Sequence, residues 1–146
     1  MLVLAQVRWW ALLVGVQMVE CEILVLEDET FIALDIELTL AEAGFQNISV
    51  HTRSDSALQW LADATPHAAL LDVNLGQGET SVTVATRLKE VGVPFAFLTG
   101  YSDATDALPA DLSGARRMTK PFESDALVEA VTAMIAQTQA CPSLAD

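Results

Sequence analysis

The stretch Ile23-Leu24-Val25-Leu26-Glu27-Asp28 decides the fold of this chain. Its apolar, β-prone half predicts a short strand over residues 22–26, and the two acids close that strand. A helix is predicted directly afterwards, over residues 30–43, and Gly44 ends it. The inward face of this helix is predicted to carry Phe31, Leu34, Leu38 and Ala41. A buried strand followed by an amphipathic helix is the first unit of an α/β fold.

The same strand–helix unit recurs towards the C-terminus. Further strands are predicted at 47–50, 68–71, 95–98 and 115–118. Further helices are predicted at 55–64, 79–91, 103–108 and 124–137, with Ser54 as a candidate N-terminal cap of the first. The last helix is predicted to face inward with Leu127, Val131, Met134 and Ile135. Five alternating units predict a parallel sheet with helices on both faces.

Composition narrows the class of protein. The chain has 146 residues, which fits one domain, and 52% of them are hydrophobic, which is enough to bury a core. It carries 20 Asp and Glu against 7 Lys and Arg, a formal charge of −13, so it lacks the basic face that sequence-independent nucleic-acid binding needs. Such acidity suits a cation site or a basic partner, or serves solubility alone.

The cysteines and histidines form no recognisable metal or redox motif. Cys21 and Cys141 stand far apart in the sequence, and we expect them to be reduced thiols in a cytoplasmic protein. His51 and His67 are isolated, and we expect each to have a structural role.

The first twenty residues form an apolar extension. Residues 2–19 are interrupted only by Gln6, Arg8, Gly15 and Gln17. Three interpretations compete: an extra helix packed on the domain or on a second copy, a weak membrane anchor, or an artefact of start-site choice with Met18 as the natural start. A membrane span is disfavoured by Arg8, which would be costly in a bilayer. The expected organisation is an extension (1–20), one α/β domain (21–139) and a tail (140–146).

Polar residues end four of the five apolar runs. Glu27-Asp28, Asp72, Thr99 and Lys120 each follow a different predicted strand. In an open parallel sheet, ligands bind outside the carboxyl ends of the strands. Neighbouring carboxylates at about 4 Å repel by about 4 kcal/mol at an effective dielectric of 20. Lys120 offsets part of that charge, and Mg2+, which binds carboxylates, waters and phosphate oxygens, can offset the rest.

This constellation predicts a phosphoryl acceptor. An aspartate can attack phosphorus and form an aspartyl phosphate, so Asp72 is the candidate nucleophile. Phosphoryl transfer depends mainly on positioning and charge neutralisation, which Lys120, Thr99 and a metal ion would supply. Each of these residues taken singly is commonly just a turn or capping residue. It is their occurrence in this order, at four strand ends, that points to a site.

Four stretches resemble the response regulator receiver domain family of two-component systems. They are ILVLEDE (23–29), LLDVNL (70–75), FLTG (97–100) and KPF (120–122), and the resemblance covers residues 21–139. The resemblance implies a flavodoxin-like, doubly wound (βα)5 fold with a five-stranded parallel sheet in the order 2-1-3-4-5. It implies a stand-alone receiver that is phosphorylated by a histidine kinase in a Mg2+-dependent reaction. It would then signal by protein–protein interaction or by phosphorelay, and not as an enzyme.

The resemblance also assigns roles residue by residue. Asp72 would be the phosphorylation site, while Thr99 and Lys120 would contact the phosphoryl group. The metal ligands would be Glu27, Asp28, Asp72 and the backbone carbonyl of Asn74. The Lys120–Pro121 bond would be cis, as is usual in the family.

Two departures from the family pattern bear on how the domain switches. Arg117 occupies the position, three residues before the lysine, where receivers usually carry Tyr or Phe, and the loop 76–79 lacks the usual Pro-Gly-Met-Asp-Gly run. The run Phe97-Leu98-Thr99-Gly100-Tyr101 is similar to the Phe-Ala-Thr-Gly motif of single-domain alphaproteobacterial regulators without the switch aromatic. Such regulators are partners of HWE or related histidine kinases. Tyr101 either takes over part of the switching role or is simply a packed loop residue.

Partners and alternatives complete the expectation. The partners would be a histidine kinase or histidine phosphotransfer protein and a downstream protein target, with no nucleic acid, and the location would be cytoplasmic. One alternative is a degenerate receiver that binds partners without phosphorylation, and another is membrane-tethered signalling. A third is a Mg2+-dependent phosphohydrolase, which would need a second acid two residues after its nucleophile, where Asn74 stands here.

Overall fold

A computed structural model describes residues 19–100, 108–138 and 141. Within them the chain forms one five-stranded sheet in the order β2-β1-β3-β4-β5, and every neighbouring pair is parallel. The strands are β1 (Val19–Leu26), β2 (Phe45–His51), β3 (Ala68–Asp72), β4 (Phe95–Thr99) and β5 (Arg116–Thr119). The helices are α2 (Thr30–Glu42), α3 (Ser54–Leu61), α4 (Val82–Glu90), the short 3-10 helix η2 (Ala110–Leu112) and α5 (Ser124–Ala136). The predicted fold class and strand order are confirmed.

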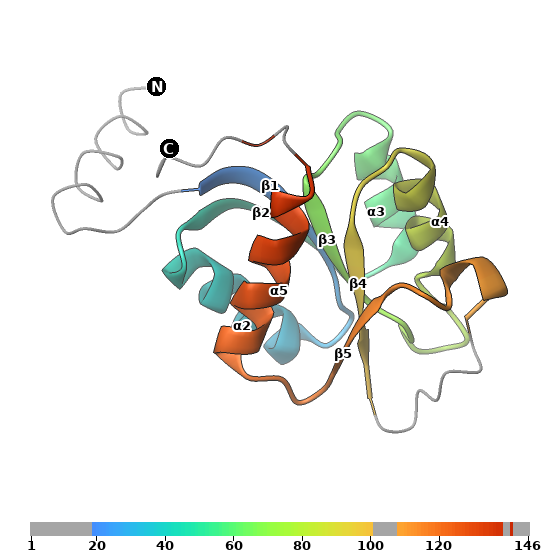
Figure 1. Cartoon of the computed structure of the whole chain (residues 1–146). Coiled ribbons are helices and arrows are strands. Elements are labelled where there is room, and N and C mark those ends of the chain that lie inside the picture. Colours follow the sequence, from blue (N-terminus) through green and yellow to red (C-terminus); the bar gives the residue numbers. More distant parts are fainter. Residues whose placement is uncertain (1–18, 101–107, 139–140, 142–146) are drawn as a thin grey trace, which may run out of the picture.

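Helices cover both faces of the sheet (Figure 1). Helices α2 and α5 lie on one face, and α3 and α4 lie on the other. Alternate residues of β1 serve the two layers: Ile23 and Val25 pack in the α2/α5 layer, whereas Leu24 and Leu26 pack in the α3/α4 layer. All four are fully buried. The central strands therefore have continuous apolar sequences because both of their faces are covered.

Helix α2 turns a different face to the core from the one predicted. Ala33, Ile36 and Leu40 are its buried residues. The four residues expected to face inward are exposed, with accessible fractions of 87% for Phe31, 48% for Leu34 and 54% for Leu38. The prediction was wrong because apolar residues surround this helix, so helical spacing alone selects no single face. In α5 the spacing was informative, and Leu127, Val131 and Met134 are buried.

Helix α4 begins three residues later than predicted. Residues 79–81 are not helical and instead follow a loop in which Gly76, Gln77 and Gly78 all have positive φ angles. The positive φ of Gln77, at 54°, is unusual for a residue with a side chain. Leu75 N donates to Glu79 O at 2.9 Å, which closes this loop before the helix starts.

The histidines have the structural roles expected of them. His67 Nδ1 accepts a hydrogen bond from Glu22 N at 2.9 Å. The two ring nitrogens of His51 lie 2.9 Å from Ser49 Oγ and 2.7 Å from Ser56 Oγ.

The cysteines are not the separate thiols expected from the sequence. Cys21, fully buried in β1, is joined by a disulfide to Cys141. The prediction was wrong because a separation of 120 residues in sequence says nothing about distance in the fold, where the two Cα atoms are 5.5 Å apart. The disulfide thereby joins the segment that follows α5 to the first part of β1.

Several expectations concern residues outside the described ranges. The extension before Val19, Tyr101, all but the last residue of the predicted helix 103–108, and most of the tail fall there. In the described part of the chain, β1 starts at Val19, so the strand begins within the predicted extension. None of the helices in that part is long and apolar enough to cross a membrane.

Candidate functional site

The predicted site residues gather where the strands end. Asp72 and Thr99 are the last residues of β3 and β4, Glu27 follows β1, and Lys120 follows β5. The parallel register sets Asp72 beside Leu98 and Thr99 beside Thr119, so neighbouring strands finish at the same edge. Lys120 N donates to Thr99 O at 2.7 Å. The strand order thus brings together residues that are up to 93 positions apart, from Glu27 to Lys120.

Three carboxylates form a cluster at this edge. Glu27, Asp28 and Asp72 each offer one oxygen, and these oxygens lie within 4.8 Å of one another. Glu27 and Asp72 are buried, with 0% and 3% of their surfaces exposed, while Asp28 is more accessible. The Lys120 Nζ atom lies 2.6 Å from Glu27 Oε1 and 3.1 Å from Asp72 Oδ2. One ammonium group therefore bridges the two buried acids.

The electrostatics of the cluster leave negative charge unbalanced. Burial, together with the hydrogen bond and the negative charge of Glu27, raises the pKa of Asp72 to about 8, although Lys120 opposes this shift. Burial alone would lower the pKa of Lys120, but Glu27 and Asp72 outweigh it and raise that pKa. Three ionised carboxylates and one ammonium carry a net charge of −2. The buried edge thus favours either a proton on Asp72 or a bound divalent cation.

The donor set suits a hard cation. Carboxylate oxygens are preferred ligands of Mg2+, which usually takes one or two of them and keeps several waters. Asp28, the more accessible acid, leaves room for such waters. The Asn74 side chain is engaged elsewhere, since its Oδ1 accepts from Gly76 N at 3.0 Å. The backbone carbonyl of Asn74 is the ligand that the resemblance implies.

The Gly76 backbone approaches the acid cluster closely. A Cβ atom on Gly76 would lie 3.5 Å from Asp28 Oδ2, and the φ angle of 82° is one that glycine adopts readily. The loop after β3 therefore packs along the cluster.

Thr99 reaches the edge with its hydroxyl already engaged. Its Oγ1 lies 3.4 Å from Met118 O, a long hydrogen bond across to β5. The Lys120–Pro121 bond is cis, as predicted. The backbone turns there from β5 towards α5.

Glu79 is a contributor that the sequence did not reveal. Its Oε1 accepts from Ser54 N at 2.9 Å, and its Oε2 lies 3.3 Å from Arg53 Nη2. Ser54 Oγ in turn donates to Thr80 O at 2.9 Å. Ser54 was predicted to cap α3, but it is the first residue of this helix, and Arg53 occupies the cap position. These contacts anchor the loop after Asp72 to the start of α3, and no local sequence signal marks a contact across 25 residues.

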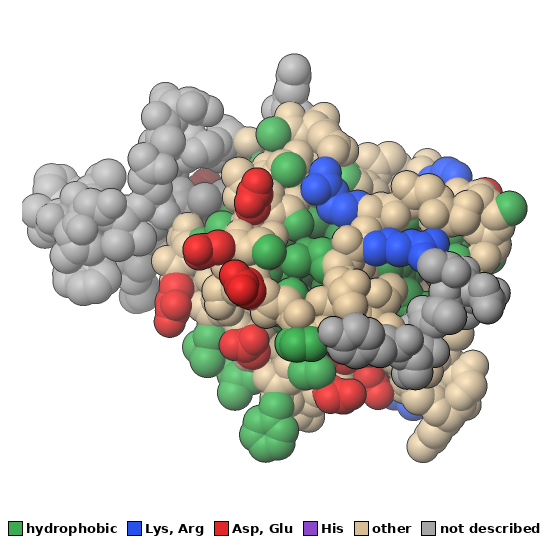
Figure 2. Space-filling view, turned by 60° about the horizontal axis from the view of Figure 1, so that its bottom comes forward, with side chains coloured by type: hydrophobic (Ala, Val, Ile, Leu, Met, Phe, Trp, Pro, Cys, Tyr) green, Lys and Arg blue, Asp and Glu red, His purple; other side chains and the backbone are tan. Residues whose placement is uncertain are grey.

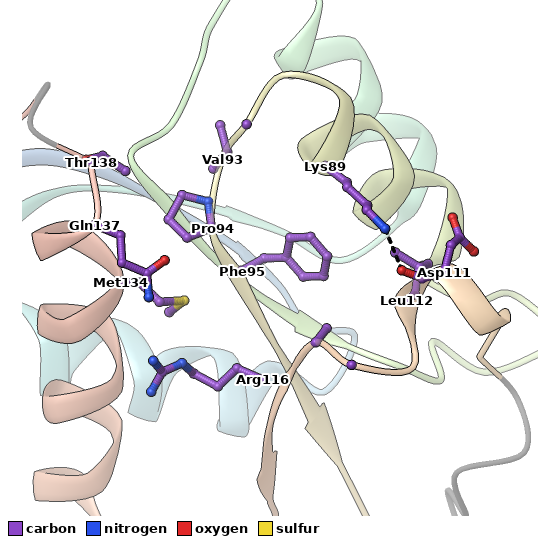
Figure 3. A pocket seen from close by; sticks show the side chains of 13 residues that line it. Lys89, Val93, Pro94, Phe95, Asp111, Leu112, Arg116, Met134, Gln137 and Thr138 are labelled. Atoms are coloured by element: carbon purple, nitrogen blue, oxygen red, sulfur yellow. Dashed lines mark hydrogen bonds between the residues drawn. The ribbon is translucent and has the colours of Figure 1, made fainter.

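A hollow of about 670 Å³ opens at the edge of the sheet opposite to the carboxylate cluster (Figure 3). It lies at the amino ends of β4 and β5 and is lined by Lys89, Phe95, Arg116 and Met134, among others. The Lys89 ammonium already donates to the Asp111 carbonyl oxygen at 2.6 Å. This hollow contains none of the clustered carboxylates, so the candidate site is the carboxyl edge.

Comparisons with known proteins agree with this geometry. The family model described as the response regulator receiver domain matches residues 23–132. The solution structure of SdrG from Sphingomonas melonis Fr1 is 34% identical, with a TM-score of 0.68, and the match covers 80% of this chain and 97% of that one. A putative response regulator from Chloroflexus aurantiacus J-10-fl is 28% identical, with a TM-score of 0.69 and coverage of 80% and 98%.

A longer relative matches over part of its length. The transcriptional regulatory protein DltR of Streptococcus agalactiae serotype III (strain NEM316) is 33% identical over 109 residues, which are 73% of this chain and 48% of the relative. The present chain therefore spans about half the length of that protein. With the fold, the edge cluster and the family match in agreement, this chain belongs to the response regulator receiver domain family.

Proposed function

We propose that this chain accepts a phosphoryl group on Asp72 from a histidine kinase or a histidine phosphotransfer protein, and signals through protein contacts. The observation that carries the proposal is the Lys120 ammonium, which bridges Glu27 and Asp72 at the edge that Asp28 and Thr99 also reach. A site of this kind sets one ammonium and a set of metal-binding oxygens beside one aspartate, so that a bound divalent cation together with Lys120 would neutralise the incoming phosphoryl group. Phosphoryl transfer needs this neutralisation more than it needs acid–base chemistry.

Glu27, Asp28, Asp72 and the backbone carbonyl of Asn74 would hold a Mg2+ ion. When bound, the metal would neutralise oxygens of the incoming phosphoryl group and favour the ionised form of Asp72. The protein's own contribution is to fix the aspartate. Asp72 ends a fully buried strand, and the next residue, Val73, donates its N–H to Leu98 O at 3.1 Å. These contacts fix the position of the Asp72 backbone.

The transfer step is a substitution at phosphorus. A carboxylate oxygen of Asp72 forms the new O–P bond while the N–P bond of the donor phosphohistidine breaks, and the imidazole nitrogen keeps the electron pair. The Lys120 ammonium would neutralise negative charge on the phosphoryl oxygens, since it already lies 3.1 Å from Asp72 Oδ2. The Thr99 hydroxyl would donate its hydrogen bond to a phosphoryl oxygen in place of the Met118 carbonyl oxygen. The Asn74 side chain cannot transfer a proton, which disfavours phosphohydrolase turnover.

A groove next to the cluster offers an approach for the donor. It is lined by Glu29, Ile32, Asp35, Gly100, Lys120, Pro121 and Phe122. Lys120 contributes to both the groove and the cluster, so the groove leads to Asp72. Its apolar walls, Ile32 on α2 and Phe122 before α5, suit the side of a partner helix that carries the phosphohistidine. We propose a kinase of the HWE type or a relative as that partner, in the cytoplasm.

The output would depend on β5, where Arg117 replaces the usual aromatic. Arg117 Nη2 donates to Ser113 O at 3.1 Å, which holds the side chain against the turn before β5. We expect Arg117→Tyr to change binding of the downstream target without changing phosphorylation of Asp72. A pull-down with wild-type and variant protein measures this, and equal target binding by both would argue against a switching role for this position.

The proposal is tested by incubating the protein with acetyl phosphate or beryllofluoride, with and without Mg2+. Intact mass and two-dimensional NMR should show a Mg2+-dependent adduct that Asp72→Asn abolishes. The matched control Asp63→Asn, an exposed acid beyond α3, should leave the adduct intact. A folded protein that forms no adduct and shows no shifts would overturn the proposal and favour a module that binds partners without phosphorylation.

A further inference from the structure

Helix α2 carries an exposed apolar row along its outer side. Phe31, Leu34 and Leu38, here called the α2 stripe, are 87%, 48% and 54% exposed. Their spacing sets them on one side of the helix, away from the buried Ile36 and Leu40. In Figure 2 apolar side chains stand out at the lower left, over the α2 region, with acidic side chains around them. Three large apolar side chains in one row are a typical mark of an interaction surface.

The charges of α2 restrict what can cover the stripe. The helix contains Asp35, Glu37 and Glu42 and no Lys or Arg. These three acids have no ion-pair partner among the described residues. A second copy that met this face with its own would bring like charges together, which is unfavourable. The stripe therefore suits an occupant that is apolar and free of acids, and that carries positive charge.

Residues 1–18 of the same chain have this chemistry. They read MLVLAQVRWWALLVGVQM, with Arg8 as the one charged side chain and no acid. Trp9 and Trp10 supply large apolar surfaces next to that arginine. The segment lies outside the described residues, and none of the clustered carboxylates of the Asp72 site belongs to it.

The sheet register brings this segment to α2. Val19, where the segment joins β1, pairs with Phe45 of β2, and Phe45 follows Glu42, the last residue of α2, by three positions. Val19, the point where the segment joins the sheet, therefore lies near the C-terminal end of the helix. Phe31 lies 11 residues before Glu42, a distance of about 17 Å along a helix. Eighteen residues span about 27 Å even when helical, so the segment can reach the whole stripe.

We propose that residues 1–18 fold back along α2 and cover the α2 stripe, with Arg8 among the acids of the helix. The occupant is thus this chain's own apolar segment, bound within one molecule. The interaction does not require phosphorylation of Asp72, so it stands or falls independently of the proposed phosphoacceptor function.

Tryptophan fluorescence of the full-length chain tests this arrangement. Trp60→Phe leaves Trp9 and Trp10 as the only tryptophans, because the chain has three. We expect their emission to be blue-shifted and shielded from acrylamide. Serine at Phe31, Leu34 and Leu38 together should shift the emission to the red and increase quenching, and these exposed positions tolerate serine without loss of the fold, which circular dichroism verifies.

Matched variants and conditions separate the proposal from its rivals. Val91→Ser, an exposed apolar residue after α4, should leave the emission unchanged. Arg8→Glu should loosen the segment, whereas Arg8→Lys should not. A solvent-exposed signal in the parent, or one insensitive to the stripe substitutions, would overturn the proposal. A shift that disappears on dilution would assign the stripe to a second copy. A shift that arises only with phosphatidylglycerol–phosphatidylcholine vesicles would assign the segment to a membrane surface, and either result also overturns it.

Discussion

At the scale of single residues, Lys120 controls the balance of charge at the carboxyl edge. Its side chain is 16% exposed and its Nζ contacts two buried carboxylates. Removing one partner of a buried ion pair leaves the other charges uncompensated, which is far more costly than losing an exposed pair. The chain has one other lysine, Lys89, which is exposed and bonds only a backbone carbonyl among the described residues.

We expect Lys120→Met to destabilise the metal-free protein by roughly 3 kcal/mol, because the buried Glu27 carboxylate then loses its counter-charge. Mg2+ should stabilise this variant more than it stabilises the wild type, since the metal supplies the missing charge. Urea unfolding with and without Mg2+ measures both effects. Lys89→Met should change the free energy of unfolding by about 0.5 kcal/mol or less. Equal losses in the two variants would contradict the bridging role of Lys120.

His51 gives the fold a pH dependence of a defined sign. Burial lowers the pKa of His51 below its usual 6.5. Between the folded-state pKa and 6.5 the unfolded chain therefore binds more protons than the native state, and stability rises with pH across that window. The contribution of His51 should be complete above pH 6.5 and lost as the pH falls through the window. Urea unfolding across this range should show a shallower slope for His51→Gln, and NMR titration of the ring should give a pKa below 6.5. A ring pKa above 6.5 would reverse the expected sign.

At the scale of elements, α2 shows how far a helical pattern can be read. The helix is apolar on its inner and outer sides, so periodicity finds the helix but not its buried face. Contact with β2 and α5 selects Ile36 and Leu40 for the core and leaves the α2 stripe outside. In α5, by contrast, polar residues mark the outer side, and the predicted inner face is the buried one.

Two substitutions on α2 distinguish its faces. Leu40 is fully buried and Leu38 is 54% exposed, two residues apart on the same helix. Leu40→Ala should lower the free energy of unfolding by about 3 kcal/mol, because it removes buried methyl groups and leaves a cavity. Leu38→Ala should change it by about 0.5 kcal/mol or less. Chemical denaturation of both variants checks the pair, and a larger loss at Leu38 would restore the face predicted from the sequence.

At the scale of the whole molecule, the disulfide between Cys21 and Cys141 joins the segment that follows α5 to strand β1. The two residues are 120 positions apart, so the crosslink would restrict almost the entire unfolded chain. Neither cysteine belongs to a motif that would have announced the pair. The two cysteines meet because β1 and α5 pack in the same layer of the fold, which no local stretch of sequence shows.

Loss of this crosslink should lower the stability of the oxidised protein. Cys141→Ser is expected to reduce the free energy of unfolding by about 2–5 kcal/mol, chiefly because the unfolded chain gains freedom. Intact mass after alkylation should show no modified thiol in the unreduced protein and two after reduction. If both thiols are alkylated without reductant, the cysteines are free and the expected loss does not apply.

The sequence by itself determined the α/β class, the approximate position of each strand and the chemical types that end them. These follow from local facts, because apolar runs, turn residues and acids at their ends are visible within a few residues. The motifs added the strand order and the cis Lys120–Pro121 bond through resemblance. Because the resemblance gave the strand order, it also predicted that one edge of the sheet carries Glu27, Asp28, Asp72, Thr99 and Lys120.

The tertiary structure alone decided which side of α2 is buried, that Cys21 meets Cys141, and that Glu79 anchors the loop after Asp72 to α3. It also decided that a single ammonium bridges two buried acids and that burial and the neighbouring Glu27 raise the pKa of Asp72. Each of these depends on distances between residues remote in sequence and on exclusion of water. Local patterns carry neither quantity, since both arise only when the two layers close over the sheet.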